Sequence, residues 1–183
     1  MNTQTIALIG LSGAGKSTVA RILAAQTLLP LIDLDALIVQ RAGLSIPTLF
    51  STYGESHFRD LEATALAEAC TSGPTVVATG GGVVLRAENR ALLRANAFVV
   101  WLDAPVDALV ARLQAHDEER PLLTGDDPAA RLRALRAARA PLYAEVAHLR
   151  AETNGRDAMG IAADILNAMP QTRNDVHQGA KQL

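Results

Sequence analysis

Apolar runs alternate with amphipathic stretches along this chain. Nearly continuous apolar residues fill residues 5–9, 75–79 and 97–102, and shorter apolar segments occupy residues 30–35 and 147–153. Such runs are typical of strands that are covered on both faces, as in a parallel sheet. Helical spacing of apolar residues predicts helices over residues 17–27, 36–42, 55–71, 88–95, 106–115, 128–138 and 157–168. The alternation predicts a doubly wound α/β fold.

Two segments interrupt this pattern. Residues 116–127 are polar and include proline and glycine, which predicts an exposed, mobile loop. The residues from 170 onward show no apolar periodicity and predict a disordered tail. We therefore expect one domain over residues 1–169 with a mobile lid at about 114–127, followed by a disordered tail over 170–183.

Composition narrows the class of protein. The chain has 183 residues, of which 49% are hydrophobic and 20% charged, as expected for an ordinary soluble domain. Its net charge of −2 gives no reason to expect a nucleic acid or an anionic membrane as a partner. The N-terminus lacks a signal-peptide pattern, and the apolar runs are too short to span a bilayer, so we expect a cytoplasmic protein. A single cysteine, Cys70, excludes an internal disulfide and is expected to be a buried apolar residue.

The stretch "GLSGAGKST", residues 10–18, lies between the first predicted strand and the first predicted helix. Its Gly-x4-Gly-Lys-Ser spacing matches the P-loop pattern. Glycines let backbone N–H groups approach phosphate oxygens, and the following helix directs its positive end at the same anion. We expect Lys16 on the β- and γ-phosphates, Ser17 as a ligand of Mg²⁺, and Thr18 near the α-phosphate. The alternative, a glycine-rich turn that binds nothing, leaves the lysine and the hydroxyls unexplained, so we predict a nucleoside triphosphate site.

Two aspartates and three consecutive glycines are candidates for binding the molecule that accepts the phosphoryl group. Asp33 and Asp35 lie two residues apart near the end of a predicted strand and would face the same way. One carboxylate would hold Mg²⁺ through water, and Asp35 would orient or deprotonate an attacking hydroxyl. The alternative for Asp35 is the N-cap of the next helix. Gly80–Gly82 follow the second buried run and either admit a ligand at the sheet edge or form a tight turn.

Three arginines are candidates for anion binding. Arg59 lies between Glu55 and Glu62 on one helical face, either as a surface ion-pair ladder or as a fixed fork that grips a carboxylate. Arg120, in the predicted loop, would close over transferring phosphates or remain solvated. Arg139 begins "RAPLY" and lies two residues before Pro141, where a helix must kink or restart, and this change of direction would aim it inward.

Taken together, these segments resemble the shikimate kinase family. The resemblance runs from about residue 6 to residue 168 and rests on "GLSGAGKST", "DLD", "LFSTYGESHFRDLE", "TGGGVV", "RPLL" and "RAPLY", in this order. It implies a P-loop NTPase fold, with three layers around a central five-stranded parallel sheet. It also implies a monomeric ATP:shikimate 3-phosphotransferase that uses ATP as co-substrate and Mg²⁺ as cofactor, and whose lid closes on binding.

The resemblance also implies roles for single residues. It assigns the ATP phosphates to Gly13, Ala14, Gly15, Lys16, Ser17 and Thr18, with Mg²⁺ at Ser17 and, through water, at Asp33. The hydroxyls of shikimate would meet Asp35 and the backbone of Gly81, and its carboxylate would meet Arg59 and Arg139, with Glu62 steadying Arg59. Arg120 would contact the ATP phosphates from the lid, and Arg112 and Arg156 would flank the adenine. Lys16, Asp35 and Arg120 are the expected catalytic residues.

Two other functions remain as alternatives. A related small-molecule kinase, such as a gluconate kinase, would share the P-loop, but the combination of Arg59, Arg139 and the three glycines favours shikimate. A kinase-like regulatory domain that binds a ligand would need a DNA-binding segment, and we find no basic helix after residue 168. An acceptor screen separates the two kinases.

Overall fold

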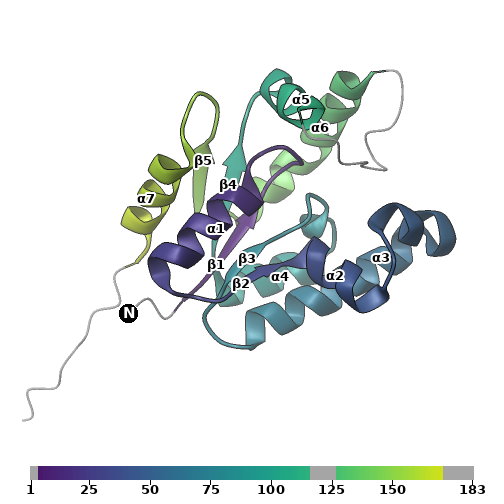
Figure 1. Cartoon of the computed structure of the whole chain (residues 1–183), viewed down its shortest axis with the longest axis horizontal. Coiled ribbons are helices and arrows are strands. Elements are labelled where there is room, and N and C mark those ends of the chain that lie inside the picture. Colours follow the sequence, from purple (N-terminus) through teal and green to yellow (C-terminus); the bar gives the residue numbers. More distant parts are fainter. Residues whose placement is uncertain (1–3, 116–126, 171–183) are drawn as a thin grey trace, which may run out of the picture.

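A five-stranded parallel sheet forms the centre of the chain. The computed structural model describes residues 4–115 and 127–170 (Figure 1). The strands are β1 (Thr5–Ile9), β2 (Leu31–Asp33), β3 (Val76–Ala78), β4 (Ala97–Asp103) and β5 (Leu149–Glu152), in the spatial order β2-β3-β1-β4-β5. Every pairing between neighbours is parallel. This architecture confirms the predicted fold class.

Helices cover both faces of the sheet and make it the middle of three layers. The helix α1 (Lys16–Thr27) packs against α7 (Ala158–Ala168) on one face, whereas α4 (Ala87–Asn96) and α6 (Pro128–Val146) contact each other and β4 on the other (Figure 1). Since both faces are covered, every residue of β1 and β4 is buried. This burial explains why the sequence shows these two strands as continuous apolar runs rather than as alternating ones.

The strand β2 is shorter than predicted, and this changes the setting of the two aspartates. Asp33 ends the strand and caps α2 (Leu34–Ala42) by accepting a hydrogen bond from the backbone N–H of Ala36 at 3.3 Å. Asp35 therefore lies in the first turn of α2. The prediction that both carboxylates share one face of a strand was wrong, because the Asp33 side chain stabilises the start of a helix at this point. The N-cap is Asp33 rather than Asp35.

The helix α3 (Ile46–Thr71) begins nine residues before the predicted start at residue 55. Ser45 caps it by accepting from the N–H of Thr48 at 3.3 Å, and a proline occupies its first turn. Gly54 interrupts the helical conformation with φ 82° and ψ 168°, so the chain kinks there. Phe50 and Phe58 pack across the kink with their ring centroids 4.8 Å apart. The predicted helix corresponds to the part of α3 that follows the kink.

The remaining helices agree with the periodicity except at one end of α6. The predicted helix over 128–138 continues through Pro141 to Val146, because Tyr143 and Val146 are buried in the core. A short 3-10 helix spans Val83–Leu85, and α5 spans Val106–Gln114. Arg120 and most of the predicted lid, residues 116–126, lie outside the described residues, as does the tail 171–183. Within the described ranges, no helix is long and apolar enough to cross a membrane.

Candidate active site

The P-loop connects the central strand β1 to α1. The Lys16 ammonium donates hydrogen bonds to the carbonyl oxygens of Gly10 and Leu11, each at 2.9 Å, so it lies over its own loop. The first residue of α1 is Lys16, and the capping residue Gly15 makes no side-chain hydrogen bond to the start of the helix. No capping side chain at Gly15 therefore competes with an anion for this helix N-terminus, which is a common position for a phosphate site.

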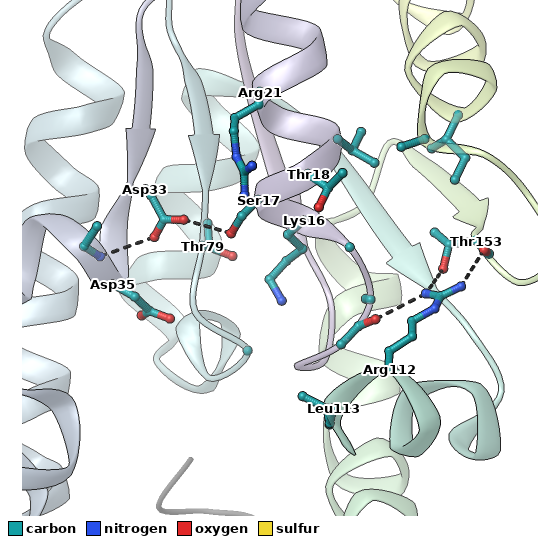
Figure 2. Close-up of a pocket in the computed structure, with 18 of the residues that line it drawn as sticks. Lys16, Ser17, Thr18, Arg21, Asp33, Asp35, Thr79, Arg112, Leu113 and Thr153 are labelled. Atoms are coloured by element: carbon teal, nitrogen blue, oxygen red, sulfur yellow. Dashed lines mark hydrogen bonds between the residues drawn. The ribbon is translucent and has the colours of Figure 1, made fainter. Parts of the chain in front are cut away.

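Ser17 and Asp33 meet at the edge of this loop. The Ser17 hydroxyl donates to the Asp33 carboxylate at 2.8 Å, and both residues line the same pocket (Figure 2). A hydroxyl and a carboxylate are hard oxygen donors of the kind that Mg²⁺ prefers. No group of three or more histidine, cysteine or acidic side chains is placed for a metal in the described parts of the chain. The two oxygens therefore fit a Mg²⁺ ion that takes most of its ligands from phosphate and water.

One pocket of about 760 Å³ brings most of the predicted residues together. Its lining includes the P-loop, Asp35, Ile46, Arg112 and Ile161. Asp35 and Arg112 lie on opposite sides of Lys16 (Figure 2). Lys16 from α1 and Asp35 from α2 both point into the space between them (Figure 2). The predicted site residues that line it are Gly13, Ala14, Gly15, Lys16, Ser17, Thr18, Asp33, Asp35, Gly81, Arg112 and Arg156.

Arg59, Glu62 and Arg139 are buried beside the three glycines. The Arg59 Nη1 donates to Glu62 at 2.7 Å, while its Nε and Nη2 both donate to one oxygen of Glu55, at 3.2 and 3.0 Å. Arg59 is only 7% exposed and Glu62 is fully buried, so the surface-ladder alternative was wrong. The Arg139 Nη1 donates to the Gly81 carbonyl at 3.1 Å. The same carbonyl accepts from the Tyr143 hydroxyl at 2.5 Å.

Burial and the opposite charge of the partner have opposing effects on the pKa values of Arg59 and Glu62. Burial of the Arg59 guanidinium lowers its pKa, but Glu62 and Glu55 outweigh that effect and hold the pKa above its ordinary value. Burial raises the pKa of the Glu62 carboxyl, and the positive charge of Arg59 offsets only part of the rise. The negative charge of Asp35 raises the pKa of Glu62 further. Arg59 is therefore a fixed cation, and Glu62 is a carboxyl with increased proton affinity.

Arg112 is held in place by the backbone around it. Its Nη1 donates to the Gly13 carbonyl at 3.2 Å and to the Thr153 hydroxyl at 3.0 Å, and its Nη2 donates to the Thr153 carbonyl at 2.7 Å (Figure 2). Arg156 forms an ion pair with Asp164 of α7 and lines the same end of the pocket. The two predicted arginines thus share this end of the pocket, but only Arg112 is bonded to the P-loop.

Sequence reasoning missed several residues of the site. Thr79 and Thr153 line the pocket. They directly follow the carboxyl ends of β3 and β5, where ligands bind in parallel α/β sheets. Arg21 also lines the pocket, one helical turn after Ser17. Tyr143 lies one turn after Arg139 on α6 and donates to the same carbonyl. Two signals in the sequence could have found these residues. The threonines are polar residues directly after an apolar run, and Arg21 and Tyr143 each lie one helical turn from a residue already assigned to the site.

Comparison with known proteins gives a consistent result. A family model described as "Shikimate kinase" matches residues 12–170. The shikimate kinase of Symbiobacterium thermophilum is 44% identical over 91% of this chain and 96% of its own length. That of Halorhodospira halophila is 48% identical over 90% of this chain and 92% of its own.

Solved structures agree with the sequence relatives. A shikimate kinase from Acinetobacter baumannii in complex with shikimate superimposes with a TM-score of 0.87 at 40% identity, covering 91% of this chain and 92% of that one. A gluconokinase from Sinorhizobium meliloti reaches a TM-score of 0.55 at 16% identity, covering 91% of each chain, which is a likeness in fold alone. The P-loop at the centre of a five-stranded parallel sheet, the extent of the family match and these relatives lead to one conclusion: the chain belongs to the shikimate kinase family.

Proposed function

We propose that this chain transfers the γ-phosphoryl group of ATP to the 3-hydroxyl of shikimate, giving shikimate 3-phosphate and ADP. One observation carries the proposal: the P-loop, Asp35 and Gly81 line the same pocket. A phosphoryl donor on the P-loop would therefore lie next to an acceptor hydroxyl at Asp35. In-line transfer needs this proximity and charge neutralisation more than covalent chemistry by the protein.

The donor site consists of the P-loop and the first turn of α1. Backbone N–H groups from Gly13 to Thr18 would hold the phosphates, and Lys16 would leave the loop carbonyls to contact the β- and γ-phosphates. Ser17, with Asp33 acting through water, would hold Mg²⁺. The ion supplies charge neutralisation on the phosphate oxygens when it is bound. We further propose that Arg112 and Arg156 flank the adenine.

The acceptor site consists of Asp35, Gly81, Arg59 and Arg139. A guanidinium has five N–H donors, and the bonds from Arg59 to Glu55 and Glu62 use three of them. The other two can donate to the carboxylate of shikimate, with Arg139 as the second cation. The same hydrogen bonds restrict Arg59 to one orientation, which lowers the entropy cost of gripping a planar anion.

We propose that Asp35 acts on the acceptor hydroxyl. It lies in the first turn of α2, at the acceptor end of the pocket. Its carboxylate would accept a hydrogen bond from the 3-hydroxyl and so direct the oxygen toward the γ-phosphorus, as the catalytic aspartate of a kinase does. Arg120 would complete the site from the lid and stabilise the charge that develops on the transferring group. This role stays a prediction, because Arg120 lies outside the described residues.

The choice of shikimate as acceptor rests on close relatives. The Acinetobacter baumannii structure that holds shikimate is 40% identical to this chain. A gluconate kinase remains a distant alternative, supported by fold likeness alone. The regulatory alternative, the monomeric state and the cytoplasmic location stay predictions.

The first experiment is an assay of ADP release from ATP and Mg²⁺ with shikimate, with gluconate, and with no acceptor. We expect ADP release that depends on shikimate and stays near the no-acceptor rate with gluconate. Release that depends on gluconate would keep the donor site and overturn the acceptor site. Measurable ATP binding without release under any condition would favour the regulatory alternative.

A further inference from the structure

The three glycines after β3 face two different parts of the molecule. A Cβ atom on Gly81 would point toward the P-loop, 3.4 Å from the Gly10 carbonyl oxygen and 3.6 Å from the Ser12 nitrogen. Cβ atoms on Gly80 and Gly82 would instead point toward side chains of α3 and α2. A Cβ atom on Gly81 would also be 3.5 Å from the Arg139 Nη1. The middle glycine thus lies between the P-loop and Arg139, whereas the outer two lie against Arg59, Glu62 and Asp35.

Gly82 lies directly against the Arg59 guanidinium. A Cβ atom there would be 2.4 Å from the guanidinium carbon and from both terminal nitrogens, so its position is over the face of the group. Separations below 3.0 Å are essentially never seen for a real Cβ atom. On the other side, Glu62 and Glu55 hold the guanidinium by hydrogen bonds of 2.7 to 3.2 Å. Arg59 can keep this position only if residue 82 has no side chain.

Gly80 lies directly against two carboxylates, as Gly82 does against the guanidinium. A Cβ atom there would be 2.7 Å from the Glu62 Oε1 and 2.9 Å from the Asp35 Oδ1. This Glu62 oxygen is buried and makes no hydrogen bond. The other oxygen of the same carboxylate accepts from the Arg59 Nη1 at 2.7 Å, and this bond holds the carboxylate in place. A methyl group on residue 80 would have to displace Asp35, Glu62 or both.

Neither outer glycine is required by its backbone conformation. Gly82 has φ −99° and ψ −1°, which an alanine adopts without strain, and Gly80 has no positive φ. The space that each leaves to a neighbouring side chain is therefore the reason for a glycine at these two positions. This separates them from Gly54, which is needed for its φ of 82°.

We propose that Gly80 and Gly82 are positioning residues of the acceptor site: Gly82 sets the place of the Arg59 guanidinium, and Gly80 sets the place of the Asp35 and Glu62 carboxylates. The inference rests on the proposed function, because it takes Arg59 as the cation for the shikimate carboxylate and Asp35 as the partner of the acceptor hydroxyl. It adds that the two glycines control different steps. Gly82 controls shikimate binding, and Gly80 controls the chemical step.

The test compares Gly82→Ala, Gly80→Ala and Arg59→Ala with the wild type. We expect Gly82→Ala to weaken shikimate binding by about tenfold to a hundredfold, the range for loss of a hydrogen bond to a charged group. Calorimetric titration of shikimate measures this, and the KM for ATP should stay within about twofold because the P-loop is untouched. Gly80→Ala should lower kcat by about a hundredfold, as expected for a misplaced catalytic group, with a smaller effect on shikimate binding.

A double variant separates positioning from general damage. In an Arg59→Ala background the group that Gly82→Ala would displace is gone, so the second substitution should cause no further loss of shikimate binding or of melting temperature. If Gly82→Ala alone folds poorly, recovery of the melting temperature in the double variant still demonstrates the contact. Gly43→Ala is the matched control: it strains the C-cap of α2 at φ 65° with nothing near its Cβ, and it should leave shikimate binding unchanged.

The outcomes distinguish the two levels of proposal. If Arg59→Ala weakens shikimate binding but Gly82→Ala does not, or if the losses in the double variant simply add, the positioning role of Gly82 is overturned. Wild-type kcat in Gly80→Ala would overturn the role of Gly80. If Arg59→Ala itself binds shikimate normally, the acceptor assignment fails, and the inference drawn from it fails with it.

Discussion

Lys16 contacts the carbonyl oxygens of its own loop, so phosphate binding must exchange these hydrogen bonds for others. The two bonds, each 2.9 Å long, keep the P-loop closed around the ammonium group. A loop held in this way is preorganised, because the lysine needs to move only a short distance to reach a phosphate at the start of α1. We therefore propose that the same side chain both shapes the loop and neutralises the charge of phosphates bound there.

We predict that Lys16→Ala lowers kcat by about a thousandfold or more, since one preorganised donor to developing charge contributes on this scale. The assay is shikimate-dependent ADP release at saturating substrates, with circular dichroism to establish that the variant is folded. Gln26→Ala, an exposed position of the same helix that does not line the pocket, is the control and should keep most of its activity. Turnover by Lys16→Ala within tenfold of the wild type would contradict the donor-site assignment.

The residues of the site were predictable where their signal is local. The P-loop has a fixed spacing, and Arg59 has its two glutamates one turn away on either side, so both can be read from nearby positions. Tyr143 and Thr153 were missed because they act on backbone or side-chain atoms far away in the sequence, at Gly81 and Arg112. Periodicity carries no information about such contacts.

At the scale of elements, the kink in α3 shapes the acceptor end of the pocket. Gly54 holds φ 82° and ψ 168°, a conformation that is essentially restricted to glycine. The kink brings Phe50 onto Phe58, and the same part of α3 begins at Ile46, which lines the pocket. The first two turns of α3 therefore depend on one residue for their direction.

Replacing Gly54 with alanine should straighten the helix or strain it. We expect a loss of about 1–3 kcal/mol in the free energy of unfolding, the usual cost of such a conformation, together with a higher KM for shikimate. Urea denaturation and steady-state kinetics measure the two effects. Since a Cβ at this position would meet nothing within 4 Å, a steric clash cannot produce the loss. Unchanged stability together with an unchanged KM would show that the kink is not needed.

Element existence followed from the sequence, whereas element boundaries often did not. Helical periodicity identified a part of each helix from α1 to α7. Capping, however, decided where two of them begin: Asp33 caps α2 and Ser45 caps α3. Both caps lie outside the periodic apolar stretch, so the spacing of apolar residues does not detect them. At the C-terminal end of α6, the helix continues beyond Pro141, a residue that disfavours helix, because Tyr143 packs in the core.

At the scale of the whole molecule, Cys70 reports on the integrity of the core. It is buried near the end of α3, as predicted, and burial raises the pKa of its thiol to about 11 from an ordinary value of 9.0. The raised pKa means that the folded state disfavours the thiolate. The contribution of this thiol to the free energy of unfolding is fully present below pH 9 and is lost as the pH rises toward 11.

We predict that the native protein reacts with a thiol reagent at pH 8 at least about a hundredfold more slowly than the urea-unfolded chain, because only the thiolate is nucleophilic. Absorbance of the released chromophore follows the reaction. Addition of ATP and shikimate should slow it further if labelling requires unfolding, since ligands stabilise the native state. Equal rates for native and unfolded protein would mean that Cys70 is accessible in the native fold.

The order of strands in the sheet was not contained in the hydrophobic pattern. Periodicity predicted a parallel α/β sheet, but the order β2-β3-β1-β4-β5 depends on which distant segments pair. Five strands in a P-loop fold were expected only through the family resemblance. The pocket depends on the same pairings, since it joins residues from the P-loop, α2 and α7.

The central place of β1 has a consequence for biosynthesis. The strand β1 is synthesised before β3 and β4, with which it pairs: Ile6 meets Val76 and Thr5 meets Ala97. Pairings between such distant segments form late, because a long loop must close first. Synthesis must therefore have passed β4 before the nucleotide loop can take its shape. A nascent chain shorter than this would gain no protection from cellular ATP and would depend on chaperones to keep its apolar strands from aggregating.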